Sequence, residues 1–350
     1  MSERGASAHL IQTAGNNRQT RGSRVVNIST SLRRATVPLA LTAAVALTAT
    51  ACGGADAGSS GGDGSKLSGT VKVDGSSTVA PLSTAAAQLF QAQESGVKVT
   101  VGTSGTGGGF EKFCAGELDV SNASRPIKDE EKAKCEQEGV KYEEFMVAND
   151  GLSVVVSKDN DFVDCLTTAQ LKKIWEPGSK VNNWNQVDPK FPDQELELFG
   201  AGTDSGTFDY FTDAINGEEG ASRTDYNPSE DDNVTVRGVS GSKGGLGYFG
   251  LSYFEENQDK LKALKIDGGD GCVAPSVETV QDGSYKPLSR PLFIYPKASS
   301  LEKPEVEKFV EFYVENNAEI AEKSLFVPLN TTQEAELKKD LEKLKAAHQS

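Results

Sequence analysis

The sequence predicts an α/β fold made of two lobes. From Leu67 onward, short runs of β-branched residues alternate with segments whose apolar residues recur at helical spacing, which is the pattern of α/β architecture. Two long extended stretches, 145–158 and 285–297, separate the two sets of alternating elements. A chain of 350 residues, 37% of them hydrophobic, can build the cores that two lobes require.

Residues 1–51 are typical of an export signal. Six arginines and one glutamate lie within the first 34 residues, and an uncharged run of 17 residues rich in Ala and Thr follows. That run is too short and too weakly apolar for a membrane span. Ala49-Thr50-Ala51-Cys52 resembles a bacterial lipobox, which predicts lipidation of Cys52. The alternative is an ordinary signal peptide with a chance cysteine.

Residues 52–66, rich in Gly, Ser, Ala and Asp, predict a flexible tether that holds a globular domain away from a membrane surface. The whole chain carries a formal net charge of −15. Loss of residues 1–51 leaves 30 basic residues against 50 acidic ones, a net charge of −20. So acidic a protein is not expected to bind nucleic acid, which requires Lys and Arg to displace counterions from phosphates.

The number and position of the histidines make several kinds of catalytic or metal site improbable. His9 lies in the export signal and His348 lies three residues from the end of the chain, so neither is expected in a packed site. Ser-His-Asp hydrolysis, histidine-ligated zinc and acid–base catalysis by histidine are therefore improbable. We expect a protein that is not an enzyme and that holds neither a cofactor nor a metal.

Lobe I is predicted from residues 67–150 and 290–350. Its first part alternates strands with helices, and its last part is helical. The order is a strand at 70–75, a helix at 80–93, a strand at 97–103, a helix at 107–117, a strand at 118–125, and helical segments at 304–323 and 331–347.

Lobe II is predicted from residues 151–289. It contains a helix at 167–176, a strand at 196–202 and a helix at 205–216, and it includes an acidic loop at 217–233. The extended stretches that join the lobes would form a two-strand hinge, because the chain crosses twice. Lobes joined in this way can close on a ligand in a cleft between them.

Four cysteines remain in the exported part of the chain: Cys114, Cys135, Cys165 and Cys272. An even number in an exported protein favours two disulfides, for which three pairings are possible. Metal binding competes poorly, because no Cys-x-x-Cys and no nearby histidine is present. Proximity in sequence favours Cys114–Cys135 with Cys165–Cys272.

Three segments, 74–78, 103–109 and 202–207, share one design. In each, a strand ends, small hydroxyl residues and glycines follow, and a helix begins. The first N–H groups of a helix lack partners and can bind an oxyanion, and hydroxyls add further donors. The alternative for any one segment is simple helix capping. The candidate anion-binding residues are Ser76, Ser77, Thr78, Ser104, Gly105, Thr106, Asp204, Ser205, Gly206 and Thr207.

A fourth candidate segment is 121–126, where the strand at 118–125 enters a loop. Ser124 adds a hydroxyl, and Arg125 offers a planar fork of donors that suits a phosphate-like anion. The alternative for Arg125 is an ion pair on an acidic surface.

Six motifs follow one another along the chain: GSSTVAP, GTSGTGGGFEKF, SNASRPI, GTDSGTFDYF, GLGYFG and LSRPLFIYP. Together they resemble the phosphate-binding lipoproteins (PstS) that serve phosphate ABC importers, and the resemblance covers nearly all of residues 67–330. It implies the periplasmic-binding-protein fold, with two α/β lobes, a two-strand hinge and a buried site between them. Ser77, Thr78, Ser104, Ser205, Gly206 and Thr207 match the family's anion-contacting positions.

Two positions depart from the well-known proteobacterial members of that family. Those proteins have an aspartate where Ser124 stands and an arginine where Ala201 stands. The aspartate is credited with accepting the proton of phosphate, and so with rejecting sulfate. We hypothesise that Arg125 replaces the arginine and that Asp204 replaces the acceptor.

The resemblance implies that the protein captures inorganic phosphate outside the cell and delivers it to a membrane permease and its ATPase. It would be anchored by lipid on the extracellular face of the membrane. The alternatives are a binding protein for another tetrahedral oxyanion, such as sulfate or molybdate, a Ser-dependent envelope hydrolase, and a surface lipoprotein that has lost transport.

Overall fold

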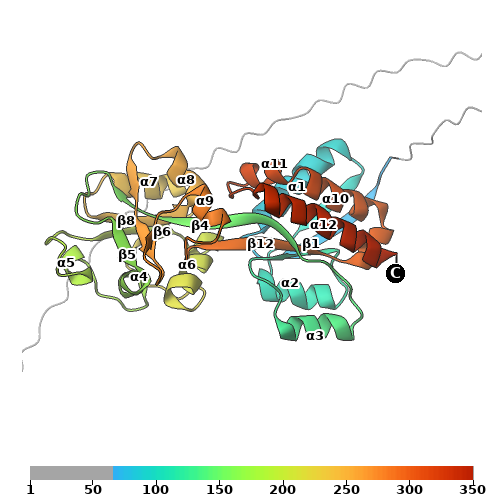
Figure 1. Ribbon diagram of the computed structural model, residues 1–350, viewed down its shortest axis with the longest axis horizontal. Helices are drawn as coiled ribbons and strands as arrows, with labels where there is room; N and C mark the ends of the chain where they lie inside the picture. Colours follow the sequence, from blue (N-terminus) through green and yellow to red (C-terminus); the bar gives the residue numbers. More distant parts are fainter. Residues whose placement is uncertain (1–65, 350) are drawn as a thin grey trace, which may run out of the picture. The chain divides into compact units, whose positions relative to one another are not determined.

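A mixed sheet runs through both lobes in the computed structural model, which describes residues 66–349 (Figure 1). Its strand order is β2-β1-β3-β12-β4-β8-β6-β7, and β9 also pairs with β4. Helices cover both faces of the sheet in each lobe. The predicted signal peptide 1–51, Cys52 and the predicted tether up to residue 65 lie outside the described residues.

Lobe I begins with three parallel strands, and their carboxyl ends lie at one edge of the sheet. They are β1 (Gly69–Gly75), β2 (Val97–Val101) and β3 (Val120–Ala123). The helices that follow them are α1 (Ala80–Gln93), α2 (Gly105–Cys114) and α3 (Asp129–Gln137). Because each loop at this edge leads into a helix, three helix N-termini gather there.

Two strands carry the chain between the lobes. They are β4 (Phe145–Ser157) and β12 (Ser289–Pro296), which pair antiparallel with Asp150 opposite Arg290. On β4, Ala148 belongs to the core of lobe I and Leu152 to the core of lobe II. The lobe boundaries at residues 150 and 290 remain a proposal about where the chain bends.

Lobe II contains the remaining strands and six helices of the described chain. The strands are β5 (Cys165–Thr167), β6 (Glu197–Ala201), β7 (Asn227–Ser229), β8 (Gly245–Gly250), β9 (Leu261–Ala263), β10 (Lys265–Asp267) and β11 (Cys272–Val273). The helices are α4 (Thr168–Trp175), α5 (Trp184–Val187), α6 (Gly206–Asn216), α7 (Asp232–Ser240), α8 (Leu251–Glu256) and α9 (Val277–Gln281). Strands β11, β10 and β5 form a separate small sheet.

The C-terminal helices return to lobe I and cover its sheet. After the 3₁₀ helix η1 (Ala298–Glu302) come α10 (Pro304–Glu315), α11 (Asn317–Lys323) and α12 (Thr331–His348). The segment between α11 and α12 reaches the other lobe, because Val327 packs in the core of lobe II and bridges to Asn149. Besides the two crossing strands, this segment is therefore a third part of the chain that contacts both lobes.

Both disulfides favoured by sequence proximity are present. Cys114–Cys135 joins α2 to α3, and Cys165–Cys272 joins β5 to β11 across 107 residues of sequence. Each bond therefore links elements within one lobe.

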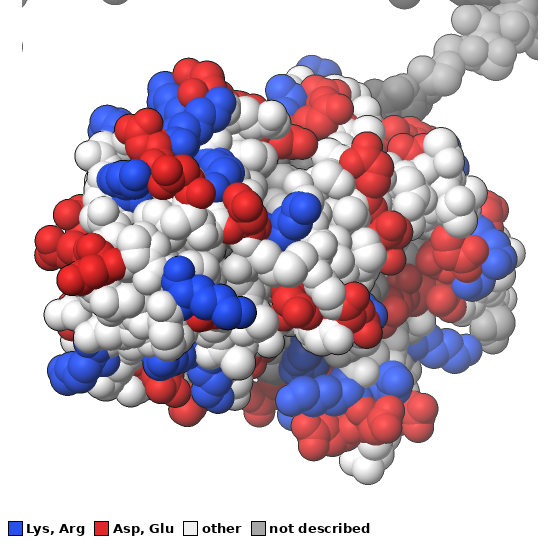
Figure 2. All heavy atoms as spheres, turned by 60° about the vertical axis from the view of Figure 1, so that its left-hand side comes forward, with Lys and Arg blue, Asp and Glu red and all other residues white. Residues whose placement is uncertain are grey.

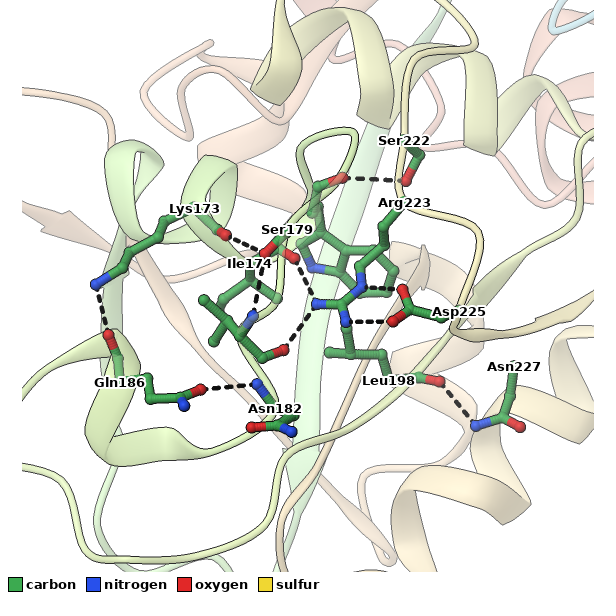
Figure 3. A network of polar contacts seen from close by, with 12 residues as sticks. Lys173, Ile174, Ser179, Asn182, Gln186, Leu198, Ser222, Arg223, Asp225 and Asn227 are labelled. Atoms are coloured by element: carbon green, nitrogen blue, oxygen red, sulfur yellow. Dashed lines mark hydrogen bonds and ion pairs between the residues drawn. The ribbon is translucent and has the colours of Figure 1, made fainter. Parts of the chain in front are cut away.

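A buried arginine organises one end of lobe II (Figure 3). Arg223 is only 6% exposed; its Nε and Nη2 donate to the Asp225 carboxylate, and its Nη1 donates to the carbonyls of Ile174 and Val181. All three guanidinium nitrogens have partners, as a buried cation requires. Arg223 thus holds the end of α4 against the loop before β7.

Among residues 66–349, no helix combines the length and apolar character that crossing a bilayer requires. In the same part of the chain, no group of three or more His, Cys, Asp or Glu side chains is arranged to hold a metal ion.

Candidate anion-binding cleft

A cleft of about 780 Å³ lies between the two lobes. Its walls come from the loops after β1, β2 and β3 in lobe I, from α6 in lobe II, and from the approach to β12. The lining residues are Ser76, Ser77, Thr78, Ser104, Gly105, Thr106, Gly107, Gly108, Ser124, Arg125, Pro126, Lys128, Asp209, Tyr210, Asp213, Ala214, Glu219, Pro287, Ser289, Arg290 and Pro291.

The N-termini of α1 and α2 supply backbone donors on the lobe I side. Neither Val79 nor Ser104, which cap these two helices, makes a side-chain capping hydrogen bond. The first N–H groups of a helix have no partner within it, and together they carry a partial positive charge. Both helix ends therefore suit an anion held in the cleft.

Glycines allow the chain to turn and to pack closely at this edge of the sheet. Gly105 begins α2 with a φ of +79°, a conformation that L side chains rarely adopt. A Cβ on Gly109 would lie 2.6 Å from the Cα of Gly75, so α2 could not approach the end of β1 with any other residue there. These glycines place the two loops side by side.

The carboxylate of Asp74 ties the first loop to the second. Its Oδ1 accepts the N–H of Gly75 at 2.8 Å and the N–H of Ser104 at 2.9 Å, and its Oδ2 accepts Lys112 Nζ at 2.5 Å. Burial raises the pKa of Asp74, but the hydrogen bonds from Lys112, Ser104 and Gly75 outweigh burial and hold that pKa below its usual value. Asp74 is therefore ionised at neutral pH.

The third loop is joined to the second by a pair of hydroxyls. Thr106 Oγ1 lies 3.1 Å from Ser124 Oγ and accepts the Ser124 N–H at 3.2 Å. Ser124 thus places a hydroxyl in the lining of the cleft.

Arg125 lines the cleft, but Glu131 occupies the end of its side chain. Its Nη1 and Nη2 each donate to the Glu131 carboxylate at 2.8 Å. The hydrogen bond with Glu131 raises the pKa of Arg125, although burial opposes the rise. The ion pair given as the alternative for Arg125 is present, and the hypothesis that Arg125 replaces the missing arginine stays a prediction.

Of the three segments that share one design, the third, 202–207, does not line this cleft. Asp204 is exposed, and with Gly206 it lines a neighbouring groove that shares Ser77 with the cleft. Ser205 caps α6 by accepting the Thr207 N–H at 3.2 Å. Neither Ser205 nor Thr207 lines either hollow.

The N-terminus of α6 nevertheless touches the first loop of lobe I. A Cβ on Gly206 would lie 2.8 Å from Thr78 Oγ1, so the glycine permits a close contact between the lobes. Asp204 is not among the residues that line the cleft, and its role as the proton acceptor stays a prediction.

Arg290 is a cation of the cleft that the sequence reasoning missed. It lies on β12; its Nε donates to Asp150 Oδ2 at 3.1 Å, and its Nη2 donates to Thr78 Oγ1 at 3.0 Å. Burial raises the pKa of Asp150, and Arg290 opposes that rise. The only sequence signal was the motif LSRPLFIYP, in which a charged residue interrupts a crossing strand.

Carboxylates line the lobe II wall of the cleft. Asp209, Asp213 and Glu219 lie there, and burial together with Glu219 raises the pKa of Asp209. Acidic and basic side chains are interspersed over the face shown in Figure 2. An anion would therefore be attracted by the local donors of the cleft rather than by the field of the whole protein.

Known proteins resemble the chain over most of its length. A family model described as a PBP superfamily domain matches residues 60–317. The SphX protein of Synechococcus elongatus is 50% identical over 262 residues, which are 74% of this chain and 77% of that protein. The phosphate-binding protein PstS of Staphylococcus saprophyticus is 44% identical over 278 residues, which are 79% of this chain and 85% of that protein.

A solved structure shows the same architecture. The crystal structure of a possible phosphate binding protein from Planctomyces limnophilus has a TM-score of 0.77 and 48% identity, and the match covers 80% of this chain and 99% of that one. The two-lobed α/β fold expected from the sequence is confirmed by this match.

Proposed function

Because the chain belongs to the PstS family of phosphate-binding proteins within the PBP superfamily, we propose that it captures inorganic phosphate in the cleft between its lobes. As the binding component of a phosphate ABC importer, it would hand the anion to a membrane permease and its ATPase. A solute-binding protein changes no covalent bond in its ligand, so we assign it no enzymatic activity.

One observation carries this proposal: donors from three separate strand–helix loops meet one arginine in a single cleft. Ser77, Thr78, Ser104 and Ser124 offer hydroxyl or backbone donors, and Arg290 offers a charged fork. A tetrahedral oxyanion presents acceptors in four directions, which matches donors that converge from several chain segments.

Arg290 also explains how an acidic protein can hold an anion without a net positive site. Asp150 lies 3.1 Å from Arg290 and balances its charge, so the pair adds charged N–H donors to the cleft without adding net charge. The helix N-termini and hydroxyls add dipoles only. Because these dipoles act over short distances, they can hold an anion in the cleft although the surface around it is acidic.

We further propose that Cys52 is lipidated after removal of residues 1–51 and that the protein works outside the cell, on the membrane. The family comparison and the pattern of residues 35–52 support this placement. Metabolic labelling with a fatty-acid analogue tests it: wild-type protein should be labelled and Cys52→Ala should not, whereas equal labelling of both would refute it.

Calorimetric titration with phosphate, sulfate and molybdate tests the ligand assignment. We expect phosphate to bind with a micromolar or tighter Kd and the other two anions much more weakly. Arg290→Gln should weaken phosphate binding about 10- to 100-fold, because a charged hydrogen bond contributes about 1.5–3 kcal/mol. Arg237→Gln, on α7 outside the cleft, is the matched control and should bind as wild type.

Tighter binding of sulfate or molybdate would transfer the assignment to that anion. Absence of binding by all three would refute the proposed function.

A further inference from the structure

Tyr210 lies directly against the cleft arginine. It stands on α6 of lobe II, and the centre of its ring is 3.7 Å from Cζ of Arg290, which stands on the crossing strand β12. Only 5% of Tyr210 is exposed. A guanidinium this close to an aromatic face is attracted by the ring quadrupole, and more strongly when water is excluded.

The ring of Tyr210 is itself held in place. Its hydroxyl donates to the carbonyl of Pro287 at 2.8 Å, on the segment that leads into β12. Burial raises the pKa of Tyr210 well above its usual value, so the hydroxyl stays protonated and able to donate. Tyr210 therefore contacts the crossing segment at two residues: it is hydrogen-bonded to Pro287 and stacked on Arg290.

The stacking decides which part of Arg290 can meet an anion. A guanidinium has five N–H bonds in one plane. Asp150 takes the bond from Nε and Thr78 takes one from Nη2, while the Tyr210 ring covers one face. Within residues 66–349, Arg290 Nη1 donates no hydrogen bond to another side chain or to the backbone. The remaining donors lie along the edge of the guanidinium.

Arg290 thus joins three parts of the molecule. Thr78 belongs to lobe I, Tyr210 belongs to lobe II, and Asp150 lies on the other crossing strand. The guanidinium therefore contacts residues of both lobes in this conformation.

We propose that Tyr210 is a positioning residue for anion binding: by stacking on Arg290 it turns the guanidinium edge-on to the cleft. The inference rests on the proposed function, since it assumes that Arg290 contacts the anion. Tyr210 itself does not need to touch the anion.

Three variants separate the stacking from other roles of the side chain. Tyr210→Leu removes the aromatic face, and we expect phosphate affinity to fall about tenfold, in line with a desolvated cation–π contact. Tyr210→Phe keeps the face and loses only the hydroxyl, so it should retain most of the affinity. Tyr253→Leu, on α8 outside the cleft, controls for loss of a tyrosine from the same lobe.

A double-mutant cycle with Arg290→Gln supplies a readout that a purely structural role would not give. If Tyr210 acts through Arg290, adding Tyr210→Leu to Arg290→Gln should cause no further loss of phosphate affinity. Thermal unfolding of each variant identifies any protein that fails to fold, and the cycle is then run with Tyr210→Met.

The outcomes distinguish this inference from the proposed function. Wild-type protein that binds no phosphate would refute both. Wild-type binding with additive losses in the cycle, with equal losses for Tyr210→Leu and Tyr210→Phe, or with unchanged affinity in a folded Tyr210→Leu would overturn the role of Tyr210 alone.

Discussion

Replacing Asp74 with alanine tests how the two main loops of the cleft are held together. The substitution removes the acceptor for the N–H groups of Gly75 and Ser104 and for Lys112 Nζ. It also removes a negative charge close to the anion site. The two consequences have opposite effects on phosphate binding, so the measured sign shows which one is larger.

The structure allows the magnitude to be worked out. Hydrogen bonds to a charged group contribute about 1.5–3 kcal/mol each. The hydrogen bond from the Ser104 N–H is exposed and the one from the Gly75 N–H is partly buried, so each contributes no more than the lower end of that range. Lys112 is 41% exposed, so its ion pair is screened and contributes at most about 1 kcal/mol. We expect Asp74→Ala to lower the free energy of unfolding by about 1–3 kcal/mol.

We expect phosphate affinity to fall about tenfold as well, because loss of position outweighs loss of repulsion. Urea unfolding and calorimetry measure the two effects. Asp74→Asn is the matched control. Its amide oxygen can still accept both N–H groups, so its free energy of unfolding should fall only by the contribution of the Lys112 ion pair. Unchanged stability together with tighter phosphate binding in Asp74→Ala would refute the reasoning.

Three further predictions concern stability. Replacing Cys165 and Cys272 with serine should lower the free energy of unfolding by about 4–5 kcal/mol, because this disulfide closes a loop of 107 residues; chemical unfolding with and without reductant measures it. Asp119→Ala should cost about 3 kcal/mol, since the buried carboxylate accepts hydrogen bonds from a backbone N–H, a serine and a lysine; a change below about 0.5 kcal/mol in urea unfolding would contradict this. Burial, followed by Asp231 and Glu230, raises the pKa of Asp232 to about 6, so its contribution to stability is present at low pH and is lost as pH rises through about 6; Asp232→Asn should flatten this loss in unfolding curves taken across the same pH range.

The sequence was sufficient to predict the loops that build most of the cleft. Helix capping uses the same residues, but glycines and small hydroxyl residues recur between a strand and a helix in three segments, so residues 76–78 and 104–106 stand out in the sequence alone. These residues line the cleft as expected. Local chain geometry places them, which is why a local pattern could predict them.

The residues missed by the sequence reasoning depend on contacts far apart in the chain. Arg290 meets Thr78 across 212 residues and Asp150 across 140 residues, and no local pattern encodes either distance. Arg125 shows the opposite case, because its partner Glu131 lies six residues away on a helix that the sequence did not reveal. That helix, α3, buries only Cys135 and so lacks the apolar periodicity that marks other helices.

Native mass spectrometry of the intact protein in phosphate, with sulfate as competitor, tests most directly whether the cleft holds a tetrahedral anion. We predict one phosphate per wild-type chain, retained in excess sulfate, and little or none on Arg290→Gln. A wild-type chain that carries no anion, or one that exchanges phosphate for sulfate as readily as the variant does, would contradict the account.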